Sequence, residues 1–245
     1  MPPSKTRISD TELEKIIEEC LLDFYDRRIK VVQGLKLNKF LKRKNPYLFR
    51  AIGTGKASEL VELILSAYLS SSDETIFGDA FFEPIAIKVS GGVVAPAEGV
   101  DFTIETDETY KAISMKSGPN IFNSSQKIKQ NDQFLSLQKR LYKIHKQYDP
   151  ILGHGYGRTN RKNKKEIYRD SSGEKFWEEI TGDPDFYLKL IRLMQGIPQK
   201  HKPEYTKLWN AIVNKFTKEF IEEYCLDDGS IDWEKLVKLV SEAKK

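Results

Sequence analysis

The sequence has few of the residues on which disulfide scaffolds and zinc modules depend. Its 245 residues include 2 cysteines and 3 histidines. Cys20 and Cys225 lie far apart, and neither has a second Cys or a His nearby to complete a zinc pattern. This usage excludes a disulfide framework and a zinc finger. We therefore expect a reduced protein that resides in the cytoplasm.

Long apolar runs are also missing. No segment of the sequence approaches the roughly 18–20 apolar residues that a membrane-spanning helix needs. Charged sequence follows the first four residues, Met-Pro-Pro-Ser, directly, so we expect neither a signal peptide nor a membrane partner. Hydrophobic residues make up 39% and charged residues 31% of the chain. This balance is typical of a folded domain and excludes a disordered tail or a fibre.

Neither sign of charge dominates, because 40 Lys and Arg face 36 Asp and Glu for a formal net charge of +4. The cations are nevertheless clustered, at residues 36–44 and at residues 158–165. Clustered cations suit a polyanion such as DNA, whereas a solvated loop is the alternative for either cluster. The cations of the second cluster that we expect to bind DNA are Arg158, Arg161, Lys162 and Lys165.

Hydrophobic periodicity predicts helices at both ends of the chain and strands in the middle. Ser70–Ser72 are expected to break one helix, and Pro84 to bend or end the next. The predicted helices cover residues 9–31, 36–43, 57–70, 73–81, 124–147, 174–181, 186–195, 205–224 and 231–243. The predicted strands cover residues 100–106, 110–116 and 151–156. This order indicates an α/β domain.

The central strand pair predicts a specific set of neighbours. If Asp107 and Glu108 form a two-residue turn, Asp101 lies opposite Ser114. Because side chains alternate along strands, Asp101, Ser114 and Lys116 then share one face. The opposite face carries the apolar residues Phe102, Ile104, Ile113 and Met115.

A carboxylate beside a lysine at adjacent strand ends suits metal-assisted hydrolysis of a phosphodiester. The carboxylate of Asp101 would hold Mg²⁺, an ion that prefers oxygen ligands, and the metal would activate the attacking water. Lys116 would position that water or stabilise the charge that develops on the phosphate. An ordinary exposed Asp–Lys cross-strand pair is the alternative.

The same residues resemble a known family. Gly99-Val100-Asp101, followed by Ile113-Ser114-Met115-Lys116-Ser117-Gly118-Pro119-Asn120, resembles the core of the PD-(D/E)XK nucleases. More narrowly, it resembles a group of type II restriction endonucleases, which Asn123-Ser124-Ser125-Gln126 and residues 70–78 also match. The resemblance covers roughly residues 57–147. It implies a restriction endonuclease-like core sheet flanked by helices, with additional N- and C-terminal helices.

The resemblance also implies a division of the chain and roles for three residues. We expect an N-terminal helical region at 1–56 and a nuclease core at 57–157. The basic loop and C-terminal helices, 158–245, would pack on the same domain. Asp101 takes the place of the metal-binding aspartate, and Lys116 that of the catalytic lysine. Met115 stands where the family uses a backbone carbonyl as a metal ligand.

The sequence departs from the family pattern at Ser114, a position of the catalytic set where most members carry Glu or Asp. A serine hydroxyl is a poor Mg²⁺ ligand, so another carboxylate is expected to complete the site. The candidates precede the strands, with Glu83 favoured and Glu74 in reserve. A solvated charge is the alternative for Glu83, and a favourable helix-start charge for Glu74.

Polar residues after Lys116 are candidates for DNA contact. They are Asn120, Ser124, Gln126 and Gln130, for which a turn-forming residue or a polar helix surface is the alternative. The predicted function is that of a Mg²⁺-dependent type II restriction endonuclease that cuts double-stranded DNA at a short sequence. The expected form is a homodimer, with a cognate DNA methyltransferase as its functional companion. The alternatives are a non-catalytic DNA-binding module that has lost metal through Ser114, and a nicking or repair nuclease.

Other suggestive residues carry no functional prediction. Gly53-Thr54-Gly55-Lys56 is not a phosphate-binding loop, because Arg50 stands where that pattern needs glycine. The three histidines, His145, His154 and His201, have no partner at a recognisable catalytic spacing. We expect them to have structural or surface roles.

Overall fold

The computed structural model describes residues 8–95, 97–119, 122–141, 145–162 and 165–243. The chain divides into two compact units. The first contains residues 1–24 and 75–197, and the second residues 25–74 and 198–245. These boundaries differ from those expected at residues 56 and 157. Within the described ranges, every helix is too short or too polar to cross a lipid bilayer.

The first unit is built on a mixed sheet that has six strands within the described residues, in the order β1-β2-β3-β4-β6-β5. Strands β3, β4 and β6 are parallel to one another, whereas β1, β2 and β5 pair antiparallel to their neighbours. The strands are β1 (Val93–Val94), β2 (Phe102–Glu105), β3 (Thr109–Lys116), β4 (Gln147–His154), β5 (Arg161–Lys162) and β6 (Arg169–Ser172).

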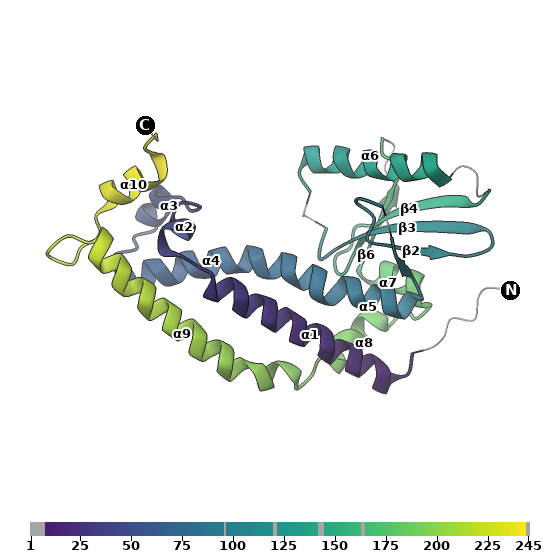
Figure 1. The fold of residues 1–245 in the computed structure, drawn as a ribbon, viewed down its shortest axis with the longest axis horizontal. Helices are drawn as coiled ribbons and strands as arrows, with labels where there is room; N and C mark the ends of the chain where they lie inside the picture. Colours follow the sequence, from purple (N-terminus) through teal and green to yellow (C-terminus); the bar gives the residue numbers. More distant parts are fainter. Residues whose placement is uncertain (1–7, 96, 120–121, 142–144, 163–164, 244–245) are drawn as a thin grey trace. The chain divides into compact units, whose positions relative to one another are not determined.

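Helices cover both faces of this sheet (Figure 1). On one face, Phe134 of α6 (Ser124–Leu141) packs against Ala112 and Leu152. On the other face, Phe176 of α7 (Gly173–Thr181) packs against Gly153. A Cβ added at Gly153 would lie 2.4 Å from the Phe176 ring. The π-helix η1 (Gly78–Phe82), α5 (Glu83–Ser90) and α8 (Phe186–Leu193) complete the unit. This arrangement confirms the predicted α/β fold class.

The predicted helix break at Ser70–Ser72 is wrong, and the helical stretch does not end at Pro84. Helix α4 (Ala57–Phe77) continues through the serines. The burial of Leu65 and Leu69 on one side of the helix outweighs the weak helix propensity of these serines. It then passes directly into η1 and α5. Pro84 follows the π-helical turn at the start of α5, where the backbone hydrogen-bond register changes and a missing N–H is tolerated.

Two boundaries and two strands also differ from the sequence prediction. Gln147 begins β4 rather than ending the preceding helix. Strands β5 and β6 were not predicted, because they consist of charged and hydroxyl residues. Helix α9 (Ile197–Tyr224) begins earlier than expected. Pro198 lies in its first turn, where proline is tolerated, whereas Pro203 lies inside the helix.

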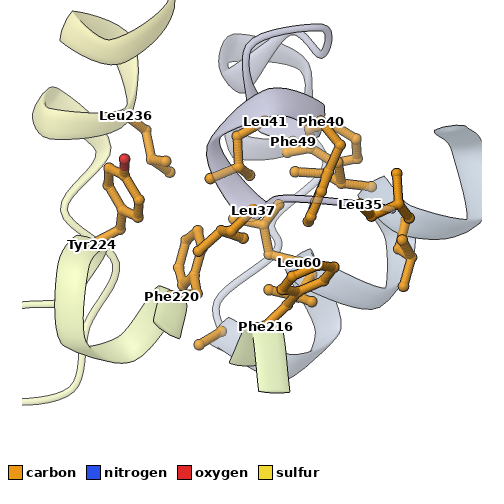
Figure 2. Close-up of a cluster of buried hydrophobic side chains, with 14 of the residues drawn as sticks. Leu35, Leu37, Phe40, Leu41, Phe49, Leu60, Phe216, Phe220, Tyr224 and Leu236 are labelled. Carbon is orange, nitrogen blue, oxygen red and sulfur yellow. The ribbon is translucent and has the colours of Figure 1, made fainter. Parts of the chain in front are cut away.

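The second unit is helical and has its own hydrophobic core (Figure 2). Leu37 and Phe40 of α2 (Leu37–Leu41) meet Phe216 and Phe220 of α9 and Leu236 of α10 (Trp233–Ser241). The short α3 (Pro46–Ala51) and parts of α1 (Asp10–Gln33) and α4 complete this core. The packing therefore unites segments from both ends of the sequence.

Both cysteines are free thiols, as the sequence predicted. Cys20 is buried in α1, and burial raises the pKa of its thiol to about 11. Cys225 is partly buried, and burial raises its pKa as well. Because the thiolate is the reactive form, both side chains act as packing residues at neutral pH.

A cluster of charged side chains ties α7 to three strands of the sheet. Arg169 of β6 donates to Asp149 of β4 at 2.7 and 2.9 Å and to Glu179 of α7 at 2.6 and 2.9 Å. Lys111 of β3 adds a contact of 2.6 Å to Glu179. Burial alone would raise the pKa of Glu179, but the hydrogen bonds from Arg169 and Lys111 outweigh it, so this pKa is lowered.

We expect Arg169→Met to destabilise the protein by about 2–3 kcal/mol at pH 7, because two partly buried carboxylates lose their shared partner. Glu179 has a lowered pKa in the folded state. Its contribution is therefore complete above the unfolded pKa of about 4.3 and is lost as the pH falls through the folded value. Urea denaturation should show the difference in unfolding free energy from wild type shrinking below about pH 4.

Lys175→Met, at an exposed ion pair with Glu178, is the control. Equal stability of Arg169→Met and wild type at pH 7 would contradict this interpretation.

Candidate active site

The β2–β3 hairpin has the register that the sequence predicted. Phe102 pairs with Ile113 and Glu105 with Tyr110. The Thr106 N–H donates to the Thr109 carbonyl at 2.9 Å and closes the two-residue turn. Asp-Glu is an unusual sequence for such a turn, but the Thr106 hydroxyl also accepts from the Thr109 N–H at 3.0 Å. This side-chain bond stabilises the turn without glycine.

Asp101 lies directly before β2 and extends its pairing by one residue. Its N–H donates to the Ile113 carbonyl at 2.9 Å, which brings the carboxylate across from Ser114. Oδ2 of Asp101 lies 2.6 Å from the Met115 N, 3.4 Å from the Ser114 Oγ and 3.4 Å from the Lys116 Nζ. Among the described residues, all the hydrogen-bond donors near the Asp101 carboxylate contact Oδ2. The second oxygen, Oδ1, therefore remains open to another ligand.

Ser114 and Gln130 form a buried polar pair beside this carboxylate. Ser114 is 0% and Gln130 4% exposed. The Gln130 Nε2 donates to the Gly99 carbonyl at 2.7 Å, which turns Oε1 toward the Ser114 hydroxyl at 3.2 Å. Gln130 was expected to face the DNA phosphate, and its burial corrects that expectation. Instead, Gln130 contacts the Ser114 hydroxyl and the carbonyl oxygen of Gly99, which lies two residues before Asp101.

The segment after Lys116 is held by the segment that follows β4. Lys116 is in register with His154. Beyond the strands, the Gly155 N–H donates to the Lys116 carbonyl at 2.9 Å, and the Tyr156 N–H to the Ser117 carbonyl at 3.1 Å. The backbone around Lys116 is therefore fixed on one side by Asp101, which accepts from the Met115 N–H, and on the other by Gly155 and Tyr156. Its side chain remains about one quarter exposed.

The upstream acids occupy different environments. Gly78 of η1 lies against Ser117, since a Cβ there would be 3.3 Å from the Ser117 Cβ. Asp79, which the sequence did not single out, is exposed beside Gly78, and Glu83 is partly buried at the start of α5. Glu74 is exposed and belongs to the second compact unit. Within the described ranges, no three His, Cys, Asp or Glu side chains form a metal-binding group.

Among the described residues that were predicted to contact DNA, all except Gln130 are exposed. Ser124 and Gln126 begin α6, where Gln126 and Asn123 cap each other's backbone N–H groups at 2.9 and 3.0 Å. The four cations of the second basic cluster are also exposed. Two of them, Arg161 and Lys162, form the edge strand β5. Asn120 lies outside the described residues.

Comparison with known proteins identifies the family. The model of a family described as type II restriction endonuclease EcoO109I matches residues 11–202, more than three quarters of the chain. The search of curated proteins found no match. The matched range includes the whole sheet and the Asp101–Lys116 hairpin. This chain belongs to the EcoO109I family of type II restriction endonucleases.

Proposed function

We propose that this restriction endonuclease hydrolyses both strands of duplex DNA at a short specific sequence and requires Mg²⁺. The observation that carries the proposal is the Asp101–Lys116 pair, whose carboxylate oxygen and ammonium nitrogen lie 3.4 Å apart on neighbouring strands. Both side chains are about one quarter exposed, so a phosphodiester can approach them. The resemblance of the hairpin residues to the PD-(D/E)XK nucleases supports the same chemistry.

The donor set fits a magnesium ion that is completed by water and substrate. Mg²⁺ is commonly held by one or two carboxylates together with water and phosphate oxygens. Oδ1 of Asp101 and the Met115 carbonyl would provide two oxygens, and Glu83 would provide the acid that Ser114 lacks. The bound ion would polarise the phosphate and lower the pKa of the attacking water. The Met115 N–H donates to Oδ2 of Asp101 at 2.6 Å and holds that side chain in place.

Lys116 supplies a second positive charge at the scissile phosphate. Its Nζ contacts Oδ2, the oxygen of Asp101 that faces the protein, and an ammonium group donates several hydrogen bonds. The group would hold the attacking water or stabilise the charge that develops on the phosphate oxygens. The backbone contacts of residues 116 and 117 to Gly155 and Tyr156 keep this side chain in register.

The remaining parts of the proposal follow from the substrate. A homodimer would match a palindromic site by its two-fold symmetry. Ser124, Gln126 and the second basic cluster would contact the DNA backbone. The expected setting is the cytoplasm, with a cognate DNA methyltransferase as the functional companion.

Plasmid cleavage in the presence and absence of Mg²⁺ tests the proposal. We expect discrete linear fragments with Mg²⁺ and none with EDTA. Open circles without linear product would indicate a nicking enzyme, and a smear would indicate a non-specific nuclease. DNA binding without cleavage under any metal would support the non-catalytic module.

Glu83→Gln is expected to raise the Mg²⁺ concentration needed for half-maximal cleavage by about tenfold or more, because the site would lose a carboxylate at constant side-chain size. The measurement is the single-turnover rate against Mg²⁺ concentration. Asp79→Asn and Glu74→Gln are the matched controls and should leave this midpoint unchanged. If either control moves the midpoint and Glu83→Gln does not, the supplementary acid has been assigned to the wrong residue.

Neutralising Lys162 and Lys165 together should weaken DNA binding and flatten its salt dependence. Each lost phosphate contact reduces the slope of log K against log salt by about 0.9. The measurement is fluorescence anisotropy of a labelled duplex across a salt series without Mg²⁺. Lys202→Gln with Lys207→Gln removes the same charge from exposed positions of α9 and serves as the control. An identical slope for all three proteins would mean that the basic cluster is only a solvated surface.

A further inference from the structure

We propose that His154 is a positioning residue that fixes the turn after the catalytic lysine and links it to the basic cluster. The turn in question comprises residues 117–119. The proposal rests on the proposed nuclease function for its catalytic consequence, but its structural part can be tested without cleavage. It assigns a role to a histidine for which the sequence offered no catalytic partner.

Both nitrogens of the His154 ring face hydrogen-bond acceptors. His154 is 3% exposed. Its Nδ1 lies 3.0 Å from the Gly118 carbonyl oxygen, and its Nε2 lies 3.3 Å from Oδ1 of Asp170 on β6. A carbonyl oxygen has no proton to give, so Nδ1–H must donate to Gly118. The ring therefore bridges the turn after β3 and the neighbouring strand β6.

The contact to Gly118 is the third of three consecutive hydrogen bonds between the two segments. The carbonyl oxygens of Lys116, Ser117 and Gly118 accept, in order, from the Gly155 N–H, the Tyr156 N–H and the His154 ring. The backbone of Gly155 is also fixed, because the Trp177 indole N–H donates to the Gly155 carbonyl at 2.8 Å. The first two contacts are backbone bonds that any sequence can form. The third depends on the side chain of residue 154.

Close packing reinforces the same turn. A Cβ at Gly118 would lie 2.4 Å from the Tyr156 ring, and a Cβ at Gly157 would lie 2.9 Å from the Pro119 ring. The two segments therefore fit together without space for movement. A buried carbonyl that loses its hydrogen-bond donor is destabilised, so loss of the His154 contact would favour displacement of the turn. Lys116 is two residues away and would move with it.

Asp170 extends the connection toward the DNA-facing surface. Its Oδ1 faces His154, and its Oδ2 lies 3.6 Å from the Nε of Arg161 in β5. The Asp170 side chain is 10% exposed, whereas that of Arg161 is 60% exposed. One carboxylate thus contacts both the buried histidine and a cation of the basic cluster. Arg161, Asp170, His154 and Gly118 form a continuous chain of polar contacts.

Two substitutions separate the two ends of the histidine. The amide nitrogen of Asn mimics Nδ1 and can reach Gly118, whereas that of Gln mimics Nε2 and can reach Asp170. We therefore compare His154→Asn with His154→Gln. At saturating Mg²⁺ and DNA, the single-turnover cleavage rate of His154→Gln should be at least about tenfold below that of His154→Asn, because small misplacements of a catalytic group cost up to about 100-fold. DNA affinity without Mg²⁺ should agree within about twofold.

Hydrogen exchange of the free protein provides the readout that does not need cleavage. In His154→Gln, amides of residues 115–118 should exchange about tenfold faster or more than in His154→Asn, while amides of α9 exchange equally in both. Equal exchange of residues 115–118 in the two variants overturns the proposal, whether or not the wild type cleaves DNA. Equal cleavage rates combined with a difference in exchange would overturn the catalytic consequence alone. Absence of cleavage by the wild type would instead count against the nuclease function.

Discussion

Asp101→Asn should lower the rate of DNA cleavage by about 10³-fold or more, because a metal ion supplies several kcal/mol of transition-state stabilisation. The reason lies in the unequal surroundings of the two carboxylate oxygens. Oδ2 accepts from the Met115 N–H and the Lys116 ammonium group, so the Asn amide must place its carbonyl oxygen there. The amide NH₂ group then occupies the metal-facing position, where it cannot be a ligand. The substitution removes the charge and the ligand together and leaves the fold intact.

The measurement is single-turnover cleavage of a labelled duplex at saturating enzyme and Mg²⁺, with DNA affinity measured separately in EDTA. Affinity in EDTA should persist, because Lys and Arg contacts to phosphate do not need the metal. Glu105→Gln is the control, since Glu105 follows Asp101 on the same face of β2 and forms an ion pair with Lys146. Normal cleavage by Asp101→Asn would exclude Asp101 as the metal ligand.

Lys116→Met should lower the cleavage rate by about 10²–10⁴-fold, which is the range for loss of a general acid or base. Methionine keeps most of the stem but removes the ammonium group. Lys116→Arg should also be impaired, because the planar guanidinium cannot replace a compact point charge. Lys129→Met removes an exposed cation of α6 and should cleave normally.

Lys116 also contacts Asp101, so its loss could act through the metal. The rates should therefore be compared at saturating Mg²⁺. If Lys116 acts on water or phosphate, the deficit remains at every Mg²⁺ concentration. A deficit that disappears at high Mg²⁺ would restrict Lys116 to the support of Asp101.

The geometry of the hairpin could be predicted because it depends on local rules. Alternation of side chains and a two-residue turn are enough to place Asp101 opposite Ser114 and beside Lys116. The burial of Phe102 and Ile113 on the other face follows from the same pattern. Register is well specified wherever one face of a strand is buried.

Contacts that join distant segments could not be predicted in this way. The position of Gln130 depends on how α6 lies across the sheet, and polar spacing along the helix gives no signal for that. His154 contacts Gly118 only because β4 pairs in parallel with β3. This pairing places His154 beside Lys116, which is 38 positions earlier in the sequence. Strand β6, with the sequence Arg-Asp-Ser-Ser, has no hydrophobic alternation to mark it.

The departure at Ser114 has a structural counterpart that the sequence did not indicate. Ser114 is fully buried, and Gln130 contacts its hydroxyl. The proposal that Glu83 supplies a second carboxylate rests on the absence of an acid at this position.

Sequencing of every DNA end produced from a digested plasmid tests the proposed function most directly. With Mg²⁺ present, we expect all new ends on both strands to fall within copies of one short sequence, and we expect no new ends in EDTA or with Asp101→Asn. Ends scattered over unrelated sequences, or ends that form equally without Mg²⁺, would contradict a site-specific, metal-dependent endonuclease built on Asp101 and Lys116.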